Sequence, residues 1–360
     1  MRWAGVLLLT LLLAGCASEP LVMRFDPGHV SAGQKLYFPP LDDEEVPRYV
    51  YVGELTGEQN FVVKEGTKKN PFVETLKWLA GLFEEPNPVL LQRPQSGVVD
   101  ENGRILVTDV SRSAVFVFDA PNGRLDLWEF AQGYRRFVAP TGIALGPAGS
   151  VFVADADLRQ VYILDPAGQG KLLIDSDQLT RPTGLAWDAA NALLYVSDTQ
   201  AHQIKVFDVT GRLLRTIGQR GEGPGEFNFP TYLSLAGERL IVSDTMNARV
   251  QILPADGDGA PQILGERGTR LGNLVRPKGV AADSENNIYV IESYYDHLLI
   301  YDRQARFLLP IGGAGKEAGA FYLPAGVWVD GGNRVFVADT FNGRIAVFQF
   351  LGGGVENDSQ

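Results

Sequence analysis

The sequence has few of the residues that build covalent or metal centres. Among its 360 residues are one cysteine, three histidines and three methionines. A single cysteine cannot form an intramolecular disulfide, and it cannot supply a zinc or iron–sulfur site built from several thiolates. The three histidines, His29, His202 and His297, are scattered along the chain. We therefore expect no metal site and no cofactor.

Basic residues are outnumbered by acidic ones. The chain has 32 lysines and arginines against 43 aspartates and glutamates, which gives a formal net charge of −11. An acidic protein repels the phosphate backbone of nucleic acids. The charge balance therefore predicts that the protein does not bind nucleic acid.

Long apolar runs are confined to the amino terminus. One arginine is followed by apolar residues over 6–13 and by small residues up to Cys16, which is the pattern of a secretory signal peptide. This run is too short for a permanent membrane span, which needs roughly 20 residues. Leu13-Ala14-Gly15-Cys16 resembles the lipobox of bacterial lipoproteins. That resemblance implies removal of residues 1–15, lipid on Cys16, and an anchor in the outer membrane, in its periplasmic or its surface leaflet.

Proline and a carboxylate recur along the chain with a common period. Each of six repeats opens with proline, continues through a short apolar run, a turn and a β-branched run, and ends in Asp or Glu. The six prolines and six carboxylates are Pro94, Pro140, Pro182, Pro230, Pro277 and Pro324, and Asp109, Asp155, Asp198, Asp244, Glu292 and Asp339. Successive members of either set lie 42–48 residues apart. A period in the forties with several short strands per repeat predicts an all-β protein, a six-bladed β-propeller.

The last repeat lacks its outer strand. It ends near Leu351 after three strands, whereas the other repeats have room for four. Residues 48–55, which precede the first repeat, have the composition of a β-strand. We predict that they complete the sixth blade, because this closes the ring and removes an exposed strand edge. Residues 48–360 are accordingly predicted to form the propeller.

Two of the repeats carry a more specific signature. Their sequences VSDTMNARV (242–250) and VADTFNGRI (337–345) resemble the core of the NHL repeat, and the resemblance extends over about 93–351. Ser96 and Tyr232 depart from it by replacing a glycine, and Glu292 by replacing an aspartate. The similarity to bacterial NHL-repeat lipoproteins implies a non-catalytic protein-interaction scaffold, accessory to an electron-transfer or secretion assembly of the envelope. Multihaem cytochromes or secretion components are the partners that it implies.

Two segments lie outside the repeats. Residues 16–47 are rich in proline and end in four consecutive acidic residues, so we predict a solvated tether between lipid and propeller. Residues 66–92 are predicted to be an insertion that contains a helix, with Asn70 as its N-cap, Pro71 as its first residue and Glu85 as its last. Its apolar residues cover more than one face. The helix is therefore either buried against the propeller, or it presents Trp78 and Leu82 to a partner.

A propeller enzyme and a small-ligand sensor are the alternative functions. A lyase or lactonase would use the central channel, and lactonases of similar shape line it with Glu, Asn and Asp. The predicted inner strands GVV, GIAL, GLAW, YLSL, GVAA and GVWV contain no such oxygen ligands, although Ca²⁺ takes about six to eight. The six repeated carboxylates are interpreted as structural, since Asp after a strand caps nearby backbone amides. We therefore expect no enzymatic activity.

The loops after the second strands form the candidate binding surface. In a propeller these loops and the linkers between blades emerge on the same rim. Several loop residues are large, apolar or aromatic, and such residues and Arg are enriched at the centres of protein interfaces. The predicted partner-binding rim contains Arg112, Arg159, His202, Met246, Tyr294, Tyr295, His297 and Phe341. The alternative for Tyr294 and Tyr295 is that their rings fold back onto neighbouring blades.

Overall fold

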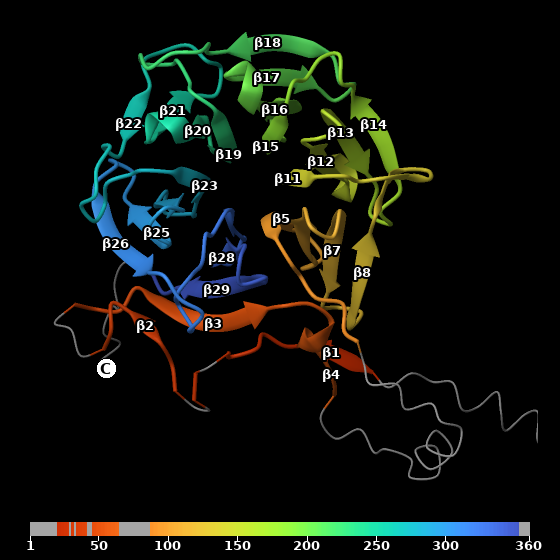
Figure 1. Ribbon diagram of the computed structural model, residues 1–360, viewed down its shortest axis with the longest axis vertical. Helices are drawn as coiled ribbons and strands as arrows, with labels where there is room; N and C mark the ends of the chain where they lie inside the picture. Colours follow the sequence, from red (N-terminus) through yellow and green to blue (C-terminus); the bar gives the residue numbers. More distant parts are fainter. Residues whose placement is uncertain (1–19, 29, 32–33, 42–44, 65–86, 353–360) are drawn as a thin grey trace, which may run out of the picture.

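Six antiparallel sheets are arranged as blades around a central axis in the computed structural model of the protein (Figure 1). The structure describes residues 20–28, 30–31, 34–41, 45–64 and 87–352. Each blade runs from an inner strand beside the axis to an outer strand at the periphery. The predicted all-β, six-bladed propeller is therefore confirmed.

The first three blades follow one another along the chain. Blade 1 consists of β5 (Pro94–Val99), β6 (Ile105–Asp109), β7 (Ala114–Asp119) and β8 (Arg124–Trp128). A small hairpin, β9 (Phe130–Gln132) and β10 (Arg135–Arg136), leads to the second blade. Blade 2 consists of β11 (Pro140–Leu145), β12 (Val151–Asp155), β13 (Gln160–Leu164) and β14 (Gly170–Ile174). Blade 3 consists of β15 (Pro182–Asp188), β16 (Leu193–Asp198), β17 (Gln203–Asp208) and β18 (Leu213–Ile217).

The remaining blades repeat this plan. Blade 4 consists of β19 (Pro230–Ala236), β20 (Arg239–Asp244), β21 (Arg249–Pro254) and β22 (Gln262–Leu264). Blade 5 consists of β23 (Pro277–Ala282), β24 (Ile288–Glu292), β25 (His297–Tyr301) and β26 (Phe307–Gly312). Blade 6 contains β27 (Val327–Val329), β28 (Arg334–Asp339) and β29 (Arg344–Phe350). Short 3-10 turns lie in the loops, namely η1 (Glu58–Asn60), η2 (Pro147–Gly149), η3 (Thr199–Ala201) and η4 (Thr245–Asn247).

An amino-terminal strand completes blade 6. β3 (Tyr49–Leu55) pairs antiparallel with β29, with Phe350 opposite Tyr49 and Ile345 opposite Leu55. The two ends of the described ring therefore meet inside one sheet (Figure 1). This pairing confirms the predicted ring closure by residues 48–55.

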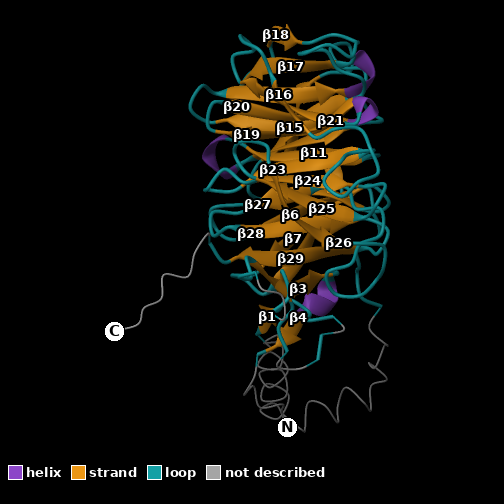
Figure 2. Ribbon diagram, turned by 90° about the vertical axis from the view of Figure 1, so that its left-hand side faces the viewer, coloured by secondary structure: helices purple, strands orange, loops and turns teal. Residues whose placement is uncertain are grey.

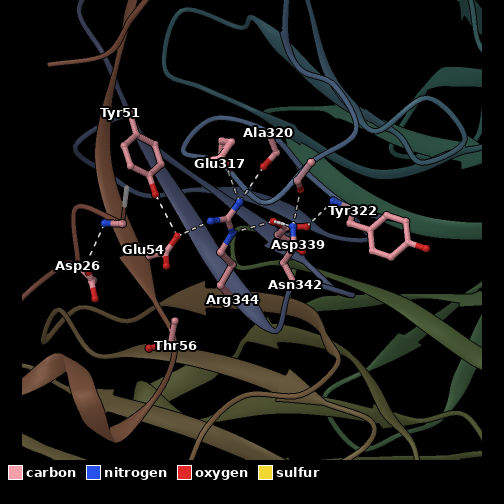
Figure 3. Close-up of polar contacts among 12 residues, drawn as sticks. Asp26, Tyr51, Glu54, Thr56, Glu317, Ala320, Tyr322, Asp339, Asn342 and Arg344 are labelled. Carbon is pink, nitrogen blue, oxygen red and sulfur yellow. Dashed lines mark hydrogen bonds and ion pairs between the residues drawn. The ribbon is translucent and has the colours of Figure 1, made fainter. Parts of the chain in front are cut away.

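A buried arginine ties the closing strand to the last repeat (Figure 3). Arg344 Nη1 lies 2.6 Å from Glu54 Oε2, and its Nε lies 2.8 Å from Asp339 Oδ2. Its Nη2 donates to the backbone oxygens of Glu317 and Ala320 at 3.1 and 2.9 Å. One side chain thus joins β3, β28 and the linker that enters blade 6.

The segment before β3 differs from the predicted free tether. β1 (Leu21–Met23) pairs with β4 (Phe61–Val63), and β2 (Tyr37–Phe38) pairs with β3 as a fifth strand of blade 6. Figure 2 shows β1 and β4 at the edge of the ring beside β3. Apolar side chains of the segment pack on the buried clusters of blades 5, 6 and 1, and these are Met23, Phe25, Val30, Leu36 and Phe38. The tether prediction for 16–47 was therefore wrong for the part that the structure describes.

Several predicted features fall outside the described residues. They are the signal peptide of residues 1–15, the lipid-bearing Cys16, His29, and the inserted helix with Trp78 and Leu82. Within the described ranges, no helix has the length and apolar character needed to cross a membrane.

The hydrophobic core is divided among the six blade interfaces. Each buried cluster combines side chains of two adjacent blades, such as Val115 and Tyr162 between blades 1 and 2. The second and third strands bury both of their faces, so β6, β7 and β12 are buried throughout. This explains why these strands are continuous apolar runs rather than alternating ones. The rigid blades fix the positions of the loops between them.

Candidate functional site

One face of the propeller collects the loops and linkers in which the sequence placed the binding site. In blades 1 to 5 the inner strand begins opposite the end of the second strand, as Pro94 opposite Asp109 and Pro277 opposite Glu292, and in blade 6 it begins close to that end. The linker before the proline and the loop after the carboxylate therefore lie side by side. We call this surface the rim face; the turns after the inner and third strands lie on the opposite face.

The repeated carboxylates hold this face together. Asp155 is fully buried, and its oxygens accept hydrogen bonds from the amides of Val138 and Ala139 in the preceding linker, at 2.7 to 3.2 Å. The same carboxylate accepts from the amides of Asp157 and Leu158 in its own loop. The other five also accept from linker amides. Four of them accept in addition from their own loop or from a side chain there, and Asp198 pairs instead with Lys205 of the third strand. The bonds to the loop were expected, whereas those to the linker were not.

Two of these carboxylates titrate abnormally. Burial raises the pKa of Glu292, and three backbone amides, together with the charge of Arg276, oppose the shift only in part. Burial likewise raises the pKa of Asp339, although the Tyr322 amide, Asn342 and Arg344 favour its charged form. These carboxylates are enclosed in the protein and their oxygens are occupied. They are structural groups rather than a ring of charge offered to a ligand.

Three of the predicted rim residues are about half exposed. The exposed fractions are 55% for Met246, 54% for Tyr294 and 50% for Phe341. Tyr295 is partly buried, and its ring packs edge-on against Tyr294 with 4.9 Å between centroids. The two tyrosines therefore pack against each other, and Tyr294 remains about half exposed to solvent.

The polar members of the predicted rim differ in accessibility. Arg159 is exposed, whereas Arg112 and His297 are partly buried. Arg112 Nε donates to the backbone oxygen of Leu90 at 2.9 Å. His297 is the first residue of β25 and lies opposite Glu292 in the register of β24 and β25. These three lie on the rim face but outside its exposed aromatic centre.

His202 does not belong to the binding surface. It is 8% exposed, its Nδ1 accepts a hydrogen bond from the amide of Phe229 at 3.2 Å, and the two rings lie 4.5 Å apart. The residue has a φ of 58°, the left-handed conformation that ends η3. This backbone conformation accompanies a ring packed against the linker of blade 4, so the prediction for His202 was wrong.

The linkers contribute residues that the sequence analysis missed. Tyr322 is 48% exposed and packs against Phe341, with 5.8 Å between ring centroids. Arg93 lies over the ring of Phe341 at 5.2 Å, and Arg276 over the ring of Tyr294 at 6.0 Å. Both arginines directly precede the proline of an inner strand, so the repeat pattern itself places them in the linkers of the rim face. We call Met246, Tyr294, Tyr295, Tyr322 and Phe341 the aromatic patch.

The central channel is closed near the rim face. The Tyr232 hydroxyl donates to the backbone oxygen of Gln95 at 3.3 Å, from blade 4 to blade 1 across the axis. Beyond it, towards the opposite face, lies a mostly apolar cavity of about 740 Å³ whose walls include Trp187 and Trp328. The cavity is lined by inner-strand residues from the level of Ser96 and Tyr232 onward and by turns of the opposite face. The aromatic patch and the cavity therefore lie on different sides of Tyr232.

Potential metal ligands are not grouped in the part of the chain that the structure describes. Among the described residues, no three His, Cys, Asp or Glu side chains gather into a group that could hold an ion. The two neighbouring carboxylates of Asp256-Gly257-Asp258-Gly259 do not form such a group either, and this segment lies in the turn between β21 and β22 of blade 4. Asp256 Oδ1 there accepts a hydrogen bond from the amide of Asp258 at 3.0 Å.

Six blades around a closed channel define the class of the protein, a six-bladed β-propeller. A family model described as a 6-bladed beta-propeller matches residues 187–258. Protein brain tumor of Drosophila melanogaster is 25% identical over 168 residues, which are 46% of this chain and 16% of that protein. NHL repeat-containing protein 2 of Bos taurus is 29% identical over 153 residues, 32% of this chain and 21% of the relative. The chain is an NHL-type six-bladed β-propeller, as its repeats predicted.

Enzymes also occur among the similar proteins. Probable peptidyl-alpha-hydroxyglycine alpha-amidating lyase pgal-1 of Caenorhabditis elegans is 27% identical over 237 residues, 55% of this chain and 65% of that protein. A solved streptogramin B lyase structure superposes with a TM-score of 0.54 and 14% identity, covering 84% of this chain and 90% of that one. At 14% identity the likeness shows the fold alone. This chain covers less than a quarter of the length of the first two relatives.

Proposed function

We propose that the protein is a non-catalytic interaction scaffold whose rim face binds another protein of the cell envelope. The observation that carries this proposal is the aromatic patch. Tyr294, Tyr322 and Phe341 come from adjacent blades 5 and 6, and each keeps about half of its surface exposed. Monomeric proteins rarely leave large apolar side chains exposed in a group, and aromatic residues, Met and Arg are enriched in interface centres.

The loops that carry the aromatic patch are fixed by the fold before any partner binds. Glu292 fixes the loop after β24 by accepting a hydrogen bond from the backbone amide of Tyr294. Asp339 accepts from the amide of Tyr322 in the linker and from the side-chain amide of Asn342 in the loop after β28. A patch on such rigid loops loses little conformational entropy when it binds. This suits a scaffold, and the proposed setting is an electron-transfer or secretion assembly with a multihaem cytochrome or a secretion component as partner.

The test of this function is partner capture with the rim changed. Tyr294→Ala/Phe341→Ala removes two exposed rings, so its melting temperature should stay within a few degrees of the original. Under the proposal, the envelope partner is recovered with the unchanged protein and lost with this variant. The matched control is Leu214→Ala/Ile263→Ala, which removes exposed apolar side chains from the outer strands of blades 3 and 4. Equal recovery with both variants would rule out the rim as the interface.

We also propose that the protein is a lipoprotein of the outer membrane, anchored through Cys16. A lipid chain contributes about 0.8 kcal/mol per buried CH₂ group, far more than an acidic surface could supply. Cys16→Ser is therefore expected to release the protein from membranes without lowering its melting temperature. Persistent membrane association of this variant in high salt would contradict the proposed anchor.

An enzyme remains the second candidate, because the cavity of about 740 Å³ is large enough for a small substrate. A lyase or lactonase that worked there would depend on residues around the channel and not on the aromatic patch. Metal analysis of the purified protein discriminates between the candidates. A stoichiometric bound metal would favour the enzyme, since the scaffold needs none.

A further inference from the structure

Three cations gather where the inner strands of blades 5, 6 and 1 reach the rim face. Arg276 precedes Pro277, Lys278 is the second residue of β23, and Arg93 precedes Pro94. We call these three residues the cation cluster. Burial lowers the pKa of Lys278, and the like charges of Arg276 and Arg93 lower it further. The three positive charges therefore act on one another.

Blade 6, which lies between the other two blades, contributes no charged residue at the equivalent position of its inner strand. Its residue equivalent to Lys278 is Ala325, which is fully buried and carries no polar group. The inner strands touch at this level, since the amide of Gly279 donates to the Ala325 oxygen at 2.7 Å. The position of blade 6 that is equivalent to Lys278 therefore supplies no carboxylate to neutralise these cations.

No ion pair within the described residues involves any member of the cation cluster. Several other cations of the rim face are paired, as are Arg181 with Asp157, Lys205 with Asp198, Arg249 with Asp244 and Arg344 with Asp339. Glu292 lies within electrostatic range of Arg276, but it is buried and its oxygens accept bonds from three backbone amides. In a chain of net charge −11, three unpaired neighbouring cations are a specific feature. An external anion would relieve their repulsion.

The surroundings indicate the size and kind of that anion. Arg93 and Arg276 rest on Phe341 and Tyr294, so the cation cluster adjoins the aromatic patch. Tyr232 closes the channel at this level, so the site is shallow and suits a single side-chain group. Nucleic acid binding depends on many phosphate contacts along a track, roughly six to ten in a typical site. One compact cluster beside aromatic rings fits a carboxylate on a protein better.

We propose that the cation cluster binds a carboxylate of an acidic segment in the partner protein, while the aromatic patch contacts the apolar residues beside it. This inference rests on the proposed function and specifies its partner. Arginine is suited to the role because its planar guanidinium can form two parallel hydrogen bonds to one carboxylate. The Lys278 ammonium would add a third charge-assisted bond.

A defined peptide tests the inference. The probe is a fluorescent peptide of glutamates around one phenylalanine, and its binding is measured by fluorescence anisotropy. Arg93→Ala/Arg276→Ala and Lys278→Met should each weaken binding about tenfold or more, which corresponds to ~1.4 kcal/mol. Lys171→Ala/Arg303→Ala changes the net charge equally, but Lys171 lies in an outer strand and Arg303 in a turn of the opposite face, so its binding should stay within about twofold. A peptide with glutamines in place of the glutamates should not bind.

Two binding measurements and one partner-capture result would each overturn the inference. One is equal affinity of the glutamate peptide for the unchanged protein and the Arg93→Ala/Arg276→Ala variant, with both shown to be folded by circular dichroism. The other is tighter binding of a labelled polyuridine RNA than of the peptide, which would identify a phosphate site. If Arg93→Ala/Arg276→Ala keeps an envelope partner that Tyr294→Ala/Phe341→Ala loses, this inference fails and the protein-binding rim stands.

Discussion

Arg344 and Glu54 form an ion pair of 2.6 Å although 290 residues separate them in the sequence. Their side chains are only 6% and 13% exposed, and Glu54 also accepts a hydrogen bond from the Tyr51 hydroxyl at 3.2 Å. Arg344 bonds at the same time to Asp339, the carboxylate of its own repeat (Figure 3). The repeat signature of blade 6 is therefore also the point at which the ring is locked.

Glu54→Gln tests this lock. The substitution removes the charge from a largely buried hydrogen bond to Arg344, so the free energy of unfolding should fall by about 2 kcal/mol. Glu58→Gln serves as its control, since Glu58 is exposed and accepts a bond from the amide of Val89. Chemical denaturation of the two variants gives the comparison. An equal effect of both substitutions would show that the pair does not lock the ring.

A shortened chain tests closure by the whole strand. A chain that begins at residue 46 keeps β3 and β4 but loses the pairing of β1 and β2. It should fold with a lower melting temperature, whereas a chain that begins at residue 64 lacks β3 and exposes the edge of β29. Such an uncovered edge favours aggregation. Equal solubility and equal melting temperatures of the two chains would contradict closure by β3.

Asp155→Ala tests the structural role of the repeated carboxylates. It leaves buried amides of the linker and of the loop without acceptors, so the free energy of unfolding should fall by about 3 kcal/mol or more. Asp157 lies two residues further on, is exposed and pairs with Arg181 at 2.8 Å. Asp157→Ala should therefore cost about 1 kcal/mol or less. Similar losses in urea unfolding would refute the structural interpretation of Asp155.

The lowered pKa of Lys278 predicts a pH-dependent gain in stability for Lys278→Met. Lys278 holds its proton less tightly in the folded than in the unfolded chain, so its charge lowers stability near pH 7. This loss disappears as the pH rises from the folded-state pKa to the ordinary value of 10.5. The variant should therefore melt a few degrees higher near neutral pH, and its advantage should shrink towards pH 10.

Lys171→Met is the control for this titration, since Lys171 is exposed on β14. It should differ little from the unchanged protein at either pH. An advantage of Lys278→Met that stays constant or grows as the pH rises would mean that Lys278 is not destabilised by its surroundings.

The sequence predicted the ring because its markers are local and repeated. Proline lies at or just before the start of an inner strand, and the carboxylate lies at the end of the second strand. Six copies of these two markers predicted six blades and showed that the last repeat lacks its outer strand. β1 and β2 could not be found in this way. They have three and two residues in a proline-rich segment, too few to show alternation, and they are strands because of what they pack against.

The candidate site was predicted in outline only. Met246, Tyr294 and Phe341 follow from their places in the loops, whereas the burial of His202 comes from its contacts with Phe229 in the next linker, which the sequence of its own loop does not identify. Arg93 and Lys278 belong to opposite ends of the repeat array and become neighbours only when the ring closes. Tyr232 was recognised as a departure from the repeat, but its contact with Gln95 across the axis is a property of the assembled ring.

The central claim, that the aromatic patch contacts an envelope protein, is tested most directly by photo-crosslinking in intact cells. A benzophenone amino acid at position 341 should yield a covalent adduct with one envelope protein, because Phe341 belongs to the patch and is half exposed. The same amino acid at position 145, an exposed leucine where the inner strand of blade 2 reaches the opposite face, should yield none. An adduct at position 145 without one at position 341 would contradict the account.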